Sequence, residues 1–338
     1  MREIPGSLQS ARSLGLLVGV LLCLAACAPR SEVIEEPHAS SVLVDADWLK
    51  AHLDDSSIAI IDLSFNESNY LEAHIPGALF VDWQTELSDP QRPELYAIMA
   101  QADFQSLMTK LGIQNDATVV LYDDMHSRAA LRLFWIMRYY GHADIRLLDG
   151  GRRAWRRAGF VLESHAESEV VDHRPETDPG STYTVSGTND AIKVAFETVE
   201  NASSVGQPAL VDARPWVQFI GDANAAAFHN GITHLHQGHI CGARNVPWRE
   251  NFSIDGTFKS KSELQDLYRG KLDRQGDAII TYCNEGLHAI VPWFVLSELL
   301  GYEHVAVYDD SLADWANRDD GKLYIGEICE NPVVATGA

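Results

Sequence analysis

Two stretches of this chain follow the same pattern but differ at the position where a nucleophile could stand. Residues 118–130 read TVVLYDDMHSRAA and residues 278–290 read AIITYCNEGLHAI, so the copies are offset by 283 − 123 = 160 positions. The aligned residue is Asp123 in the first copy and Cys283 in the second. Cysteine is a soft, polarisable nucleophile and aspartate is not. We therefore expect any chemistry to take place in the second copy, on Cys283.

The elements expected around Cys283 suit a reactive thiol. An apolar run of strand length, residues 278–282, precedes it, and a helical pattern over residues 289–300 follows a short loop. Ligands of open α/β sheets bind beyond the carboxyl ends of the strands, and loop N–H groups beside a helix N-terminus stabilise an anion. The same field lowers a thiol pKa from ~8.5. Gly286 can supply the positive φ that a tight loop needs, whereas the first copy has His126 there.

The repeat predicts two tandem α/β domains, each with a mainly parallel sheet flanked by helices. In both copies, short apolar runs alternate with longer helical patterns. We expect a first domain over residues 42–164 without a nucleophile, and a catalytic second domain over residues 191–325. The polar stretch between them, residues 165–190, contains prolines and a glycine and is typical of a linker.

The N-terminus has the pattern of a targeting segment. Arg2 and Arg12 precede a short apolar stretch, and Leu-Ala-Ala-Cys closes it at Cys27. This tetrad resembles the lipobox of bacterial lipoproteins. The resemblance implies a signal peptide over residues 1–26, lipidation of Cys27 and a flexible tether over residues 27–41. An ordinary secretory signal with an incidental cysteine is the alternative. We expect an anchor facing the periplasm, in the outer membrane because Ala28 lacks the aspartate that favours inner-membrane retention.

Composition limits the partners of the protein. The 338 residues carry a formal net charge of −22, with a pI of about 4.8. An acidic surface of this kind argues against nucleic-acid binding, which needs a basic footprint. It also means that local dipoles must capture any anionic substrate, because the overall field opposes it.

Several motifs together resemble the rhodanese superfamily, specifically its two-domain sulfurtransferases. They are listed here in chain order: His-Ile-Pro-Gly-Ala at 74–78, Asp-Ala-Arg at 212–214, His-Ile-Cys-Gly-Ala at 239–243, the Tyr-Cys loop at 282–288, and Tyr-Asp-Asp to Trp at 308–315. The resemblance implies that Cys283 takes a sulfane sulfur from a small anionic donor as a persulfide. The sulfur then passes to a thiol or cyanide-like acceptor. No organic cofactor and no metal is implied.

The same resemblance assigns substrate binding to the loop after the cysteine. Its members are Asn284, Glu285, Gly286, Leu287 and His288. Thiosulfate-type relatives usually have basic residues directly after the cysteine, and mercaptopyruvate-type relatives have small ones. The loop departs from both patterns, and we expect the Glu285 carboxylate to disfavour doubly charged donors.

The nearest candidate cation for a substrate is Arg214. A basic residue that relatives often carry a few positions after the Asp-Ala-Arg turn is missing here. Arg214 either binds substrate or supports the turn, and the sequence leaves both roles open.

Cys241 replaces the proline of the first-copy motif. It could pair with another cysteine such as Cys329, or resolve a persulfide on Cys283, but we favour a buried inert thiol. The insertion over residues 221–237 holds three histidines, His229, His234 and His236, followed closely by His239. These could suggest a metal, but His239 aligns with His74 of the first copy, so a structural role or a lid is favoured.

Two other functions compete with sulfur transfer. A cysteine-dependent phosphatase would need an arginine near the end of the loop, where His288 and Ala289 stand instead. A non-catalytic binding or scaffold module is the stronger alternative, because Glu285 sits unusually close to the nucleophile.

Overall fold

The computed structural model describes residues 42–92, 96–164, 182–222, 237–272, 277–327, 329 and 332–333. The expected signal peptide, Cys27 with its tether, most of the linker and the histidines of the insertion (His229, His234 and His236) lie outside these residues. No helix within the described ranges is long and apolar enough to cross a membrane. Within the same ranges, no three His, Cys, Asp or Glu side chains gather as metal ligands would.

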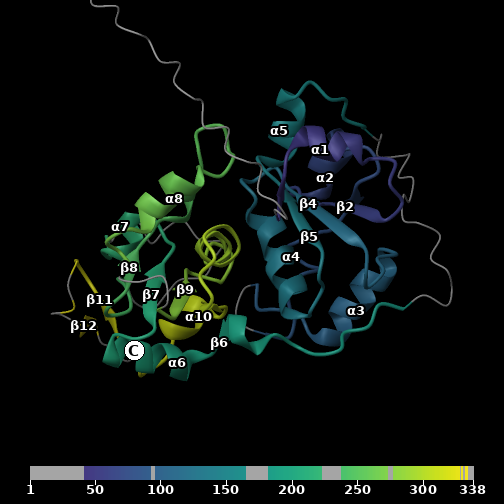
Figure 1. The fold of residues 1–338 in the computed structure, drawn as a ribbon. Coiled ribbons are helices and arrows are strands. Elements are labelled where there is room, and N and C mark those ends of the chain that lie inside the picture. Colours follow the sequence, from purple (N-terminus) through teal and green to yellow (C-terminus); the bar gives the residue numbers. More distant parts are fainter. Residues whose placement is uncertain are drawn as a thin grey trace, which may run out of the picture. The chain divides into compact units, whose positions relative to one another are not determined.

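The first half contains a five-stranded parallel sheet with helices against it (Figure 1). The strands, in spatial order, are β1 (Leu43–Val44), β5 (Ile145–Leu148), β4 (Thr118–Tyr122), β2 (Ile58–Asp62) and β3 (Leu79–Phe80). Its helices are α1 (Ala46–Ala51), α2 (Glu67–Glu72), α3 (Gln101–Lys110), α4 (Arg128–Tyr139) and α5 (Gly151–Arg157).

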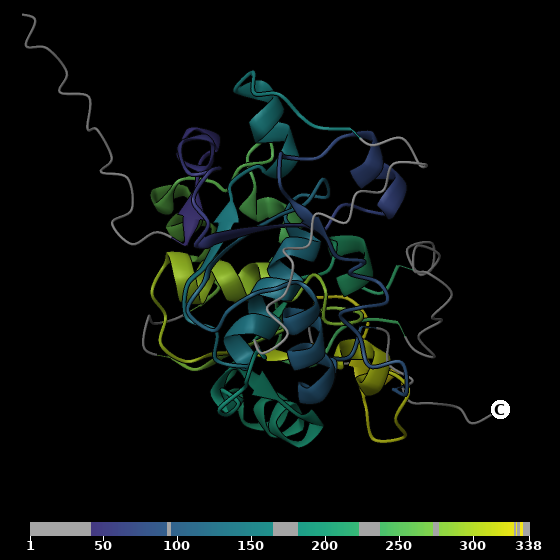
Figure 2. The ribbon, with the colours of Figure 1, turned by 90° about the vertical axis from the view of Figure 1, so that its right-hand side faces the viewer.

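The second half repeats this topology, and its elements are followed from teal to yellow in Figures 1 and 2. The strand order is β6 (Lys193–Val194), β10 (Val305–Tyr308), β9 (Ile279–Tyr282), β7 (Ala209–Asp212) and β8 (Arg244–Asn245), again all parallel. A separate antiparallel pair joins β11 (Leu323–Tyr324) to β12 (Pro332–Val333). The remaining elements are η1 (Asp190–Ile192), α6 (Phe196–Val205), α7 (Trp216–Phe219), η3 (Trp248–Asn251), α8 (Lys261–Tyr268), α9 (Ile290–Phe294), η4 (Val295–Leu299) and α10 (Ser311–Trp315). The predicted fold class is confirmed.

The central strands position Asp123 and Cys283. Strands β4 and β9 each have a neighbour on both sides, and every residue of β9 is buried. A strand covered on both faces needs a continuous apolar run rather than an alternating one. The two copies meet this requirement with the runs that end in Tyr122 and Tyr282. The next residue in each chain segment, Asp123 or Cys283, therefore lies at the carboxyl edge of the sheet.

The helix after the Cys283 loop differs in detail from its expected form. A single helix over residues 289–300 was predicted, whereas α9 is followed by a π-helical segment, η4. There the N–H of Leu300 donates to the carbonyl of Val295, five residues back, over 2.9 Å. The helical region ends with Leu300, the predicted last residue, as its C-cap, and Gly301 follows with a φ of +75°, which a glycine after a helix commonly adopts.

Helices α4 and α9 meet at equivalent residues of the two copies. Three pairs separated by 160 positions are in contact: Phe134 with Phe294 (ring centroids 5.0 Å), Arg138 with Glu298 (3.4 Å), and Arg128 with His288 (3.0 Å). Contact between equivalent residues is what a two-fold rotation between two copies produces. The described halves are therefore related by an approximate two-fold axis that passes between α4 and α9.

A reciprocal pair of hydrogen bonds follows the same two-fold relation. The N–H of Ile98 donates to the Asp309 carboxylate, and the N–H of Phe258 donates to that of Asp149, each over 2.9 Å. One buried ion pair breaks the symmetry, because Arg132 of α4 contacts Asp309 at 2.5 Å. The position equivalent to Arg132 in the second copy is Pro292. Asp309 thus accepts from both a backbone amide and a guanidinium of the first half.

A disulfide closes the second half. Cys241 is bonded to Cys329, with a Cα–Cα distance of 5.5 Å and 88 positions between them along the chain. The interpretation of Cys241 as an inert or resolving thiol is therefore wrong, and the disulfide alternative holds. Among the described residues, Cys283 is the cysteine that remains free.

Candidate active site

Cys283 is held at the end of β9 by the first turn of α10. Its N–H donates to the Ser311 hydroxyl over 3.1 Å, and its carbonyl accepts from the N–H of Leu312 over 3.2 Å. The residue is only 1% exposed. The strand end and the helix start therefore fix the thiol in place from both sides.

Backbone amides of the following loop surround the Cys283 sulfur. Burial raises the pKa of the thiol, whereas hydrogen bonds from the backbone of Glu285, Ala289 and His288 lower it, and the Glu285 charge raises it. The net shift is upward because desolvation penalises the thiolate more than the amides favour it. The expectation that the loop lowers the thiol pKa is therefore wrong in this structure, although the predicted amides are in place.

The first copy displays what the same loop does with an anion. The Asp123 carboxylate accepts hydrogen bonds from four backbone amides, those of Met125, Ser127, Ala129 and Ala130, at 2.8–3.1 Å. Met125 and Ala129 correspond to Glu285 and Ala289, whose amides face the sulfur of Cys283. The loop is therefore an anion cradle, and in the first copy a side chain fills it.

Gly286 is required for both conformation and space. Its φ is +81°, as predicted, and a Cβ at this position would lie 2.4 Å from the carbonyl oxygen of Asp309. Any side chain would therefore push the loop away from Asp309, which Arg132 holds in place.

Two of the expected substrate-binding side chains serve the loop itself. Asn284 is 2% exposed and donates to the Gln218 side chain of α7 over 3.1 Å. Leu287 is 6% exposed and packs into the hydrophobic core. Both side chains anchor the loop in this structure, so a substrate would meet its backbone at these positions.

Glu285 lies inside the site with a strongly altered acidity. Its residue is 7% exposed, and desolvation raises the pKa of its carboxyl from 4.5 to about 7. The carboxyl group therefore changes charge near neutral pH rather than carrying a constant negative charge.

His288 packs against Trp248 and Arg128. Its ring stacks on Trp248 with centroids 4.9 Å apart, and its Nε2 is 3.0 Å from Nη1 of Arg128. A guanidinium can only donate, so the Nε2 of His288 is the acceptor and the ring is neutral in this arrangement. The guanidinium groups of Arg128 and Arg249 both lie over the Trp248 ring, at 5.0 and 4.6 Å from its centroid.

The chain is similar to known proteins over most of its length. The model of the rhodanese-like domain matches twice, at residues 45–158 and 196–318. The chain belongs to the rhodanese family. The sulfur carrier protein TtuD of Thermus thermophilus is 36% identical over 279 residues, covering 82% of this chain and 94% of that protein. A protein of Haloferax volcanii, named as a candidate thiosulfate sulfurtransferase, is 35% identical over 287 residues, covering 83% and 95%.

Solved structures agree with these matches. The crystal structure of SseA from Escherichia coli, described as a 3-mercaptopyruvate sulfotransferase, superposes with a TM-score of 0.66 at 29% identity. It covers 80% of this chain and 99% of SseA. The two-domain architecture and the sulfurtransferase character of this rhodanese rest on this agreement over nearly the whole length of its relatives.

Arg214 of this rhodanese supports the turn that carries it. The residue is 3% exposed, and its guanidinium contacts the Asp212 carboxylate at 2.5 Å and the Gly238 carbonyl at 2.8 Å. Burial disfavours its charge, but the Asp212 carboxylate outweighs this and the pKa of Arg214 is raised overall. Of the two roles left open, these contacts favour the structural one.

Sequence reasoning missed Arg128 and Arg249 as cations of this site. The repeat itself carried a usable signal for Arg128, since the equivalent residue 160 positions later is His288. Equivalent residues meet only if the copies are related by a two-fold axis through this point, and the sequence does not specify that axis. Arg249 directly follows Trp248, and the sequence gave no indication that the Trp248 ring stacks on His288.

Proposed function

We propose that this rhodanese transfers a sulfane sulfur from a small anionic donor, of the thiosulfate or 3-mercaptopyruvate type, through a persulfide on Cys283. The observation that carries the proposal is the pair of equivalent cradles. One holds the Asp123 carboxylate with four amides, and the other surrounds the Cys283 sulfur. A persulfide anion extends from Cys283 by one sulfur, into the same arrangement of N–H donors.

The chemistry balances without a cofactor. The Cys283 thiolate attacks the sulfane sulfur of the donor, a sulfur–sulfur bond forms, and the donor leaves with the electron pair of its broken bond, as sulfite in the case of thiosulfate. A thiol or cyanide-like acceptor then attacks the outer sulfur of the persulfide, and Cys283 leaves as the thiolate. The loop amides stabilise negative charge on sulfur in both steps.

Positive charge near the loop supports an anionic donor. The protein as a whole is acidic, so capture depends on local groups. Arg128 contacts His288 of the loop at 3.0 Å, and the Arg249 guanidinium lies 4.6 Å from the centroid of the Trp248 ring on which His288 stacks.

The first prediction tests the nucleophile. Incubation with thiosulfate or 3-mercaptopyruvate should add the mass of one sulfur atom to the parent, and Cys283→Ser should gain none. The matched control is Asp123→Asn, the equivalent position of the other copy, which should still acquire sulfur. Intact-mass spectrometry reads all three proteins. Equal sulfur uptake by Cys283→Ser and the parent would refute the assignment.

A non-catalytic binding module is the second candidate, because Cys283 is almost fully buried and a carboxyl group lies two residues away. The same mass measurement separates it from sulfur transfer. A parent protein that takes up no sulfur from either donor, while remaining folded, favours the binding module.

We also propose that the protein is anchored by a lipid on Cys27 to the periplasmic face of the outer membrane, on the basis of the Leu-Ala-Ala-Cys tetrad and of Ala28. The Cys241–Cys329 disulfide supports an oxidising compartment.

The second prediction is that Cys27→Ser moves the protein from the membrane fraction to the soluble periplasmic fraction, measured by immunoblotting of fractionated cells. Retention of Cys27→Ser with the membranes to the same extent as the parent would rule out this anchor.

A further inference from the structure

A cavity lies over the cradle of the first copy, the one without a nucleophile. Its volume is about 290 Å³. It is lined by Asp123, Asp124, His126, Ser127, Gly150, Arg152, Arg153, Arg156 and Gly256. Eight of these belong to the first half, and Gly256 comes from the second.

The second copy has different residues at the equivalent positions. Adding 160 to the three arginines that line the cavity gives Leu312, Ala313 and Ala316, so these charges are peculiar to the first copy. Subtracting 160 from Gly256 gives Tyr96, and both residues have positive φ, +93° and +60°. The second half therefore contributes a glycine to this cavity where the equivalent residue of the first half is an aromatic one, and the first half contributes arginines where the equivalent residues of the second half are apolar.

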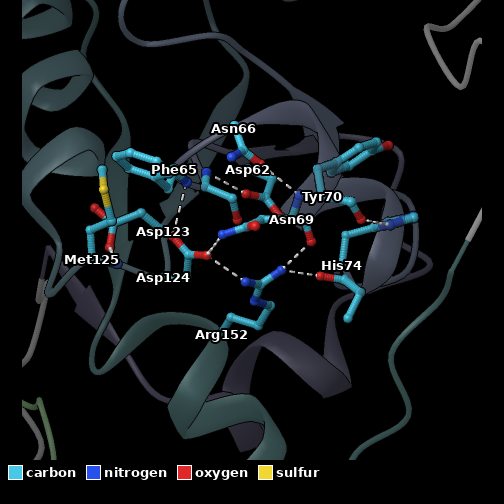
Figure 3. A network of polar contacts seen from close by, with 12 residues as sticks. Asp62, Phe65, Asn66, Asn69, Tyr70, His74, Asp123, Asp124, Met125 and Arg152 are labelled. Atoms are coloured by element: carbon cyan, nitrogen blue, oxygen red, sulfur yellow. Dashed lines mark hydrogen bonds and ion pairs between the residues drawn. The ribbon is translucent and has the colours of Figure 1, made fainter.

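The acidic residues of the cavity wall are already satisfied within the protein. Asp123 accepts from four loop amides. Asp124 contacts Arg152 at 2.5 Å and also accepts from the Phe65 N–H and the Asn69 side chain, as Figure 3 shows. The guanidinium of Arg152 is also occupied within the protein, since it pairs with Asp124 and donates to the carbonyl of Asn69 over 2.6 Å.

Arg153 and Arg156 are in a different situation. Both are exposed, and within the described residues neither forms an ion pair. Arg153 reaches toward the cavity floor, because its Nη1 would lie 3.8 Å from a Cβ on Gly256, beside a carbon of the His126 ring at 3.9 Å. The nearby acidic side chain of Asp255 is paired with Arg157 at 3.3 Å. Two guanidinium groups thus remain for a ligand.

We propose that this cavity binds a small oxyanion with two or more negative charges, in the class that sulfite, sulfate, thiosulfate and phosphate share. Arg153 and Arg156 supply positive charge and hydrogen-bond donors, and Gly256 leaves space for the ligand because it has no side chain. Guanidinium groups match the geometry of such oxyanions. The cavity is small for an organic ligand, since typical ligand pockets start at about 300 Å³. This site is independent of Cys283 and of the proposed sulfur transfer.

The test is calorimetric titration of the full chain with inorganic phosphate and with sulfate, neither of which can donate a sulfane sulfur. We expect saturable binding to the parent. Arg153→Gln/Arg156→Gln should weaken it by at least about tenfold, because two charge-assisted contacts are lost. The control is Arg244→Gln/Arg269→Gln, which changes the net charge equally at exposed positions elsewhere and should bind like the parent.

A steric variant tests the cavity without changing charge. Gly256→Tyr copies the residue that the equivalent position tolerates in the first half, and it should abolish binding. Amide resonances of His126 and Gly150 in the parent should shift on titration with phosphate, whereas that of Gly286 should not. Parallel titrations with sulfite and thiosulfate on Cys283→Ser rank the sulfur oxyanions against phosphate. Absence of binding to the parent, or equal binding by the parent and Arg153→Gln/Arg156→Gln, would overturn the proposal.

Discussion

Asp123 and Cys283 occupy equivalent positions, and the sequence predicts that of these two residues Cys283 is the nucleophile. It also predicted the positive φ of Gly286, because a tight loop after a strand needs such a residue. The burial of Glu285 could not be predicted. A charged residue in a loop is usually solvated, and its burial here depends on segments packed over the loop from elsewhere in the chain.

The third prediction concerns donor preference and Glu285. At pH 8 the parent carries a Glu285 carboxylate beside the thiol, because its pKa is about 7. Glu285→Gln should then raise the ratio of kcat/KM for thiosulfate to that for 3-mercaptopyruvate by about tenfold, since ~1.4 kcal/mol of repulsion is removed from the more highly charged donor. At pH 6 the parent is mostly protonated and the ratio should change little. Steady-state kinetics with both donors measure this, and an equal ratio in both proteins at pH 8 would contradict it.

The pH dependence of the free energy of unfolding checks whether the pKa of Glu285 is raised in the folded protein. The pKa of Glu285 is raised from 4.5 to about 7 on folding, so the folded protein holds a proton that the unfolded chain releases. The parent is therefore favoured below about pH 4.5 and loses stability as the pH rises through 7, by up to about 3 kcal/mol. Glu285→Gln should lack this loss. Denaturant unfolding at pH 5 and pH 8 compares the two proteins.

Helices α4 and α9 bring the two loops together, and this arrangement was beyond reach of the sequence. The helical pattern predicted the segment over residues 289–300, and the helical region does end before Gly301. Nothing in that pattern indicated that Arg132, within α4, is 1% exposed and paired with Asp309 across the two halves. A buried charge depends on a partner that is distant in sequence, and a local pattern does not contain it.

The fourth prediction tests that ion pair. Arg132→Met should lower the free energy of unfolding by about 3–5 kcal/mol, because it leaves Asp309 as a buried carboxylate without its cation. Adding Asp309→Asn should restore part of the loss, since the neutral amide tolerates burial better. Arg269→Met, which breaks an exposed pair with Asp266, is the control and should change stability by less than about 1 kcal/mol. Equal effects of the two single substitutions would show that Arg132 is not buried as described.

At the scale of the whole chain, the repeat predicted two α/β domains, and the structure and the family matches agree. The disulfide was the part that spacing could not assign. Cysteine positions alone allow several pairings. Which pair forms depends on which cysteines the fold brings within bonding distance. Here the motif at Cys241 and the segment after β11 meet.

The fifth prediction concerns this crosslink. Cys241→Ser/Cys329→Ser should lower the free energy of unfolding by about 2–4 kcal/mol, because the unfolded chain regains the freedom of a closed loop. Denaturant unfolding with and without a reductant measures the effect. Reduction should bring the parent to the level of the variant and leave the variant unchanged. Sulfur uptake on Cys283 should persist in the folded variant, and a parent insensitive to reductant would argue against the bond.

The contact between Arg138 and Glu298 limits which halves can associate with each other. These residues occupy equivalent positions beside an approximate two-fold axis. In a homodimer of either half, position 138 would face another arginine, or position 298 another glutamate, and like charges would repel. Covalent duplication removes that restriction, because each copy can mutate alone. Each half is thereby matched to the other rather than to itself, which disfavours pairing of two first halves or of two second halves from different molecules.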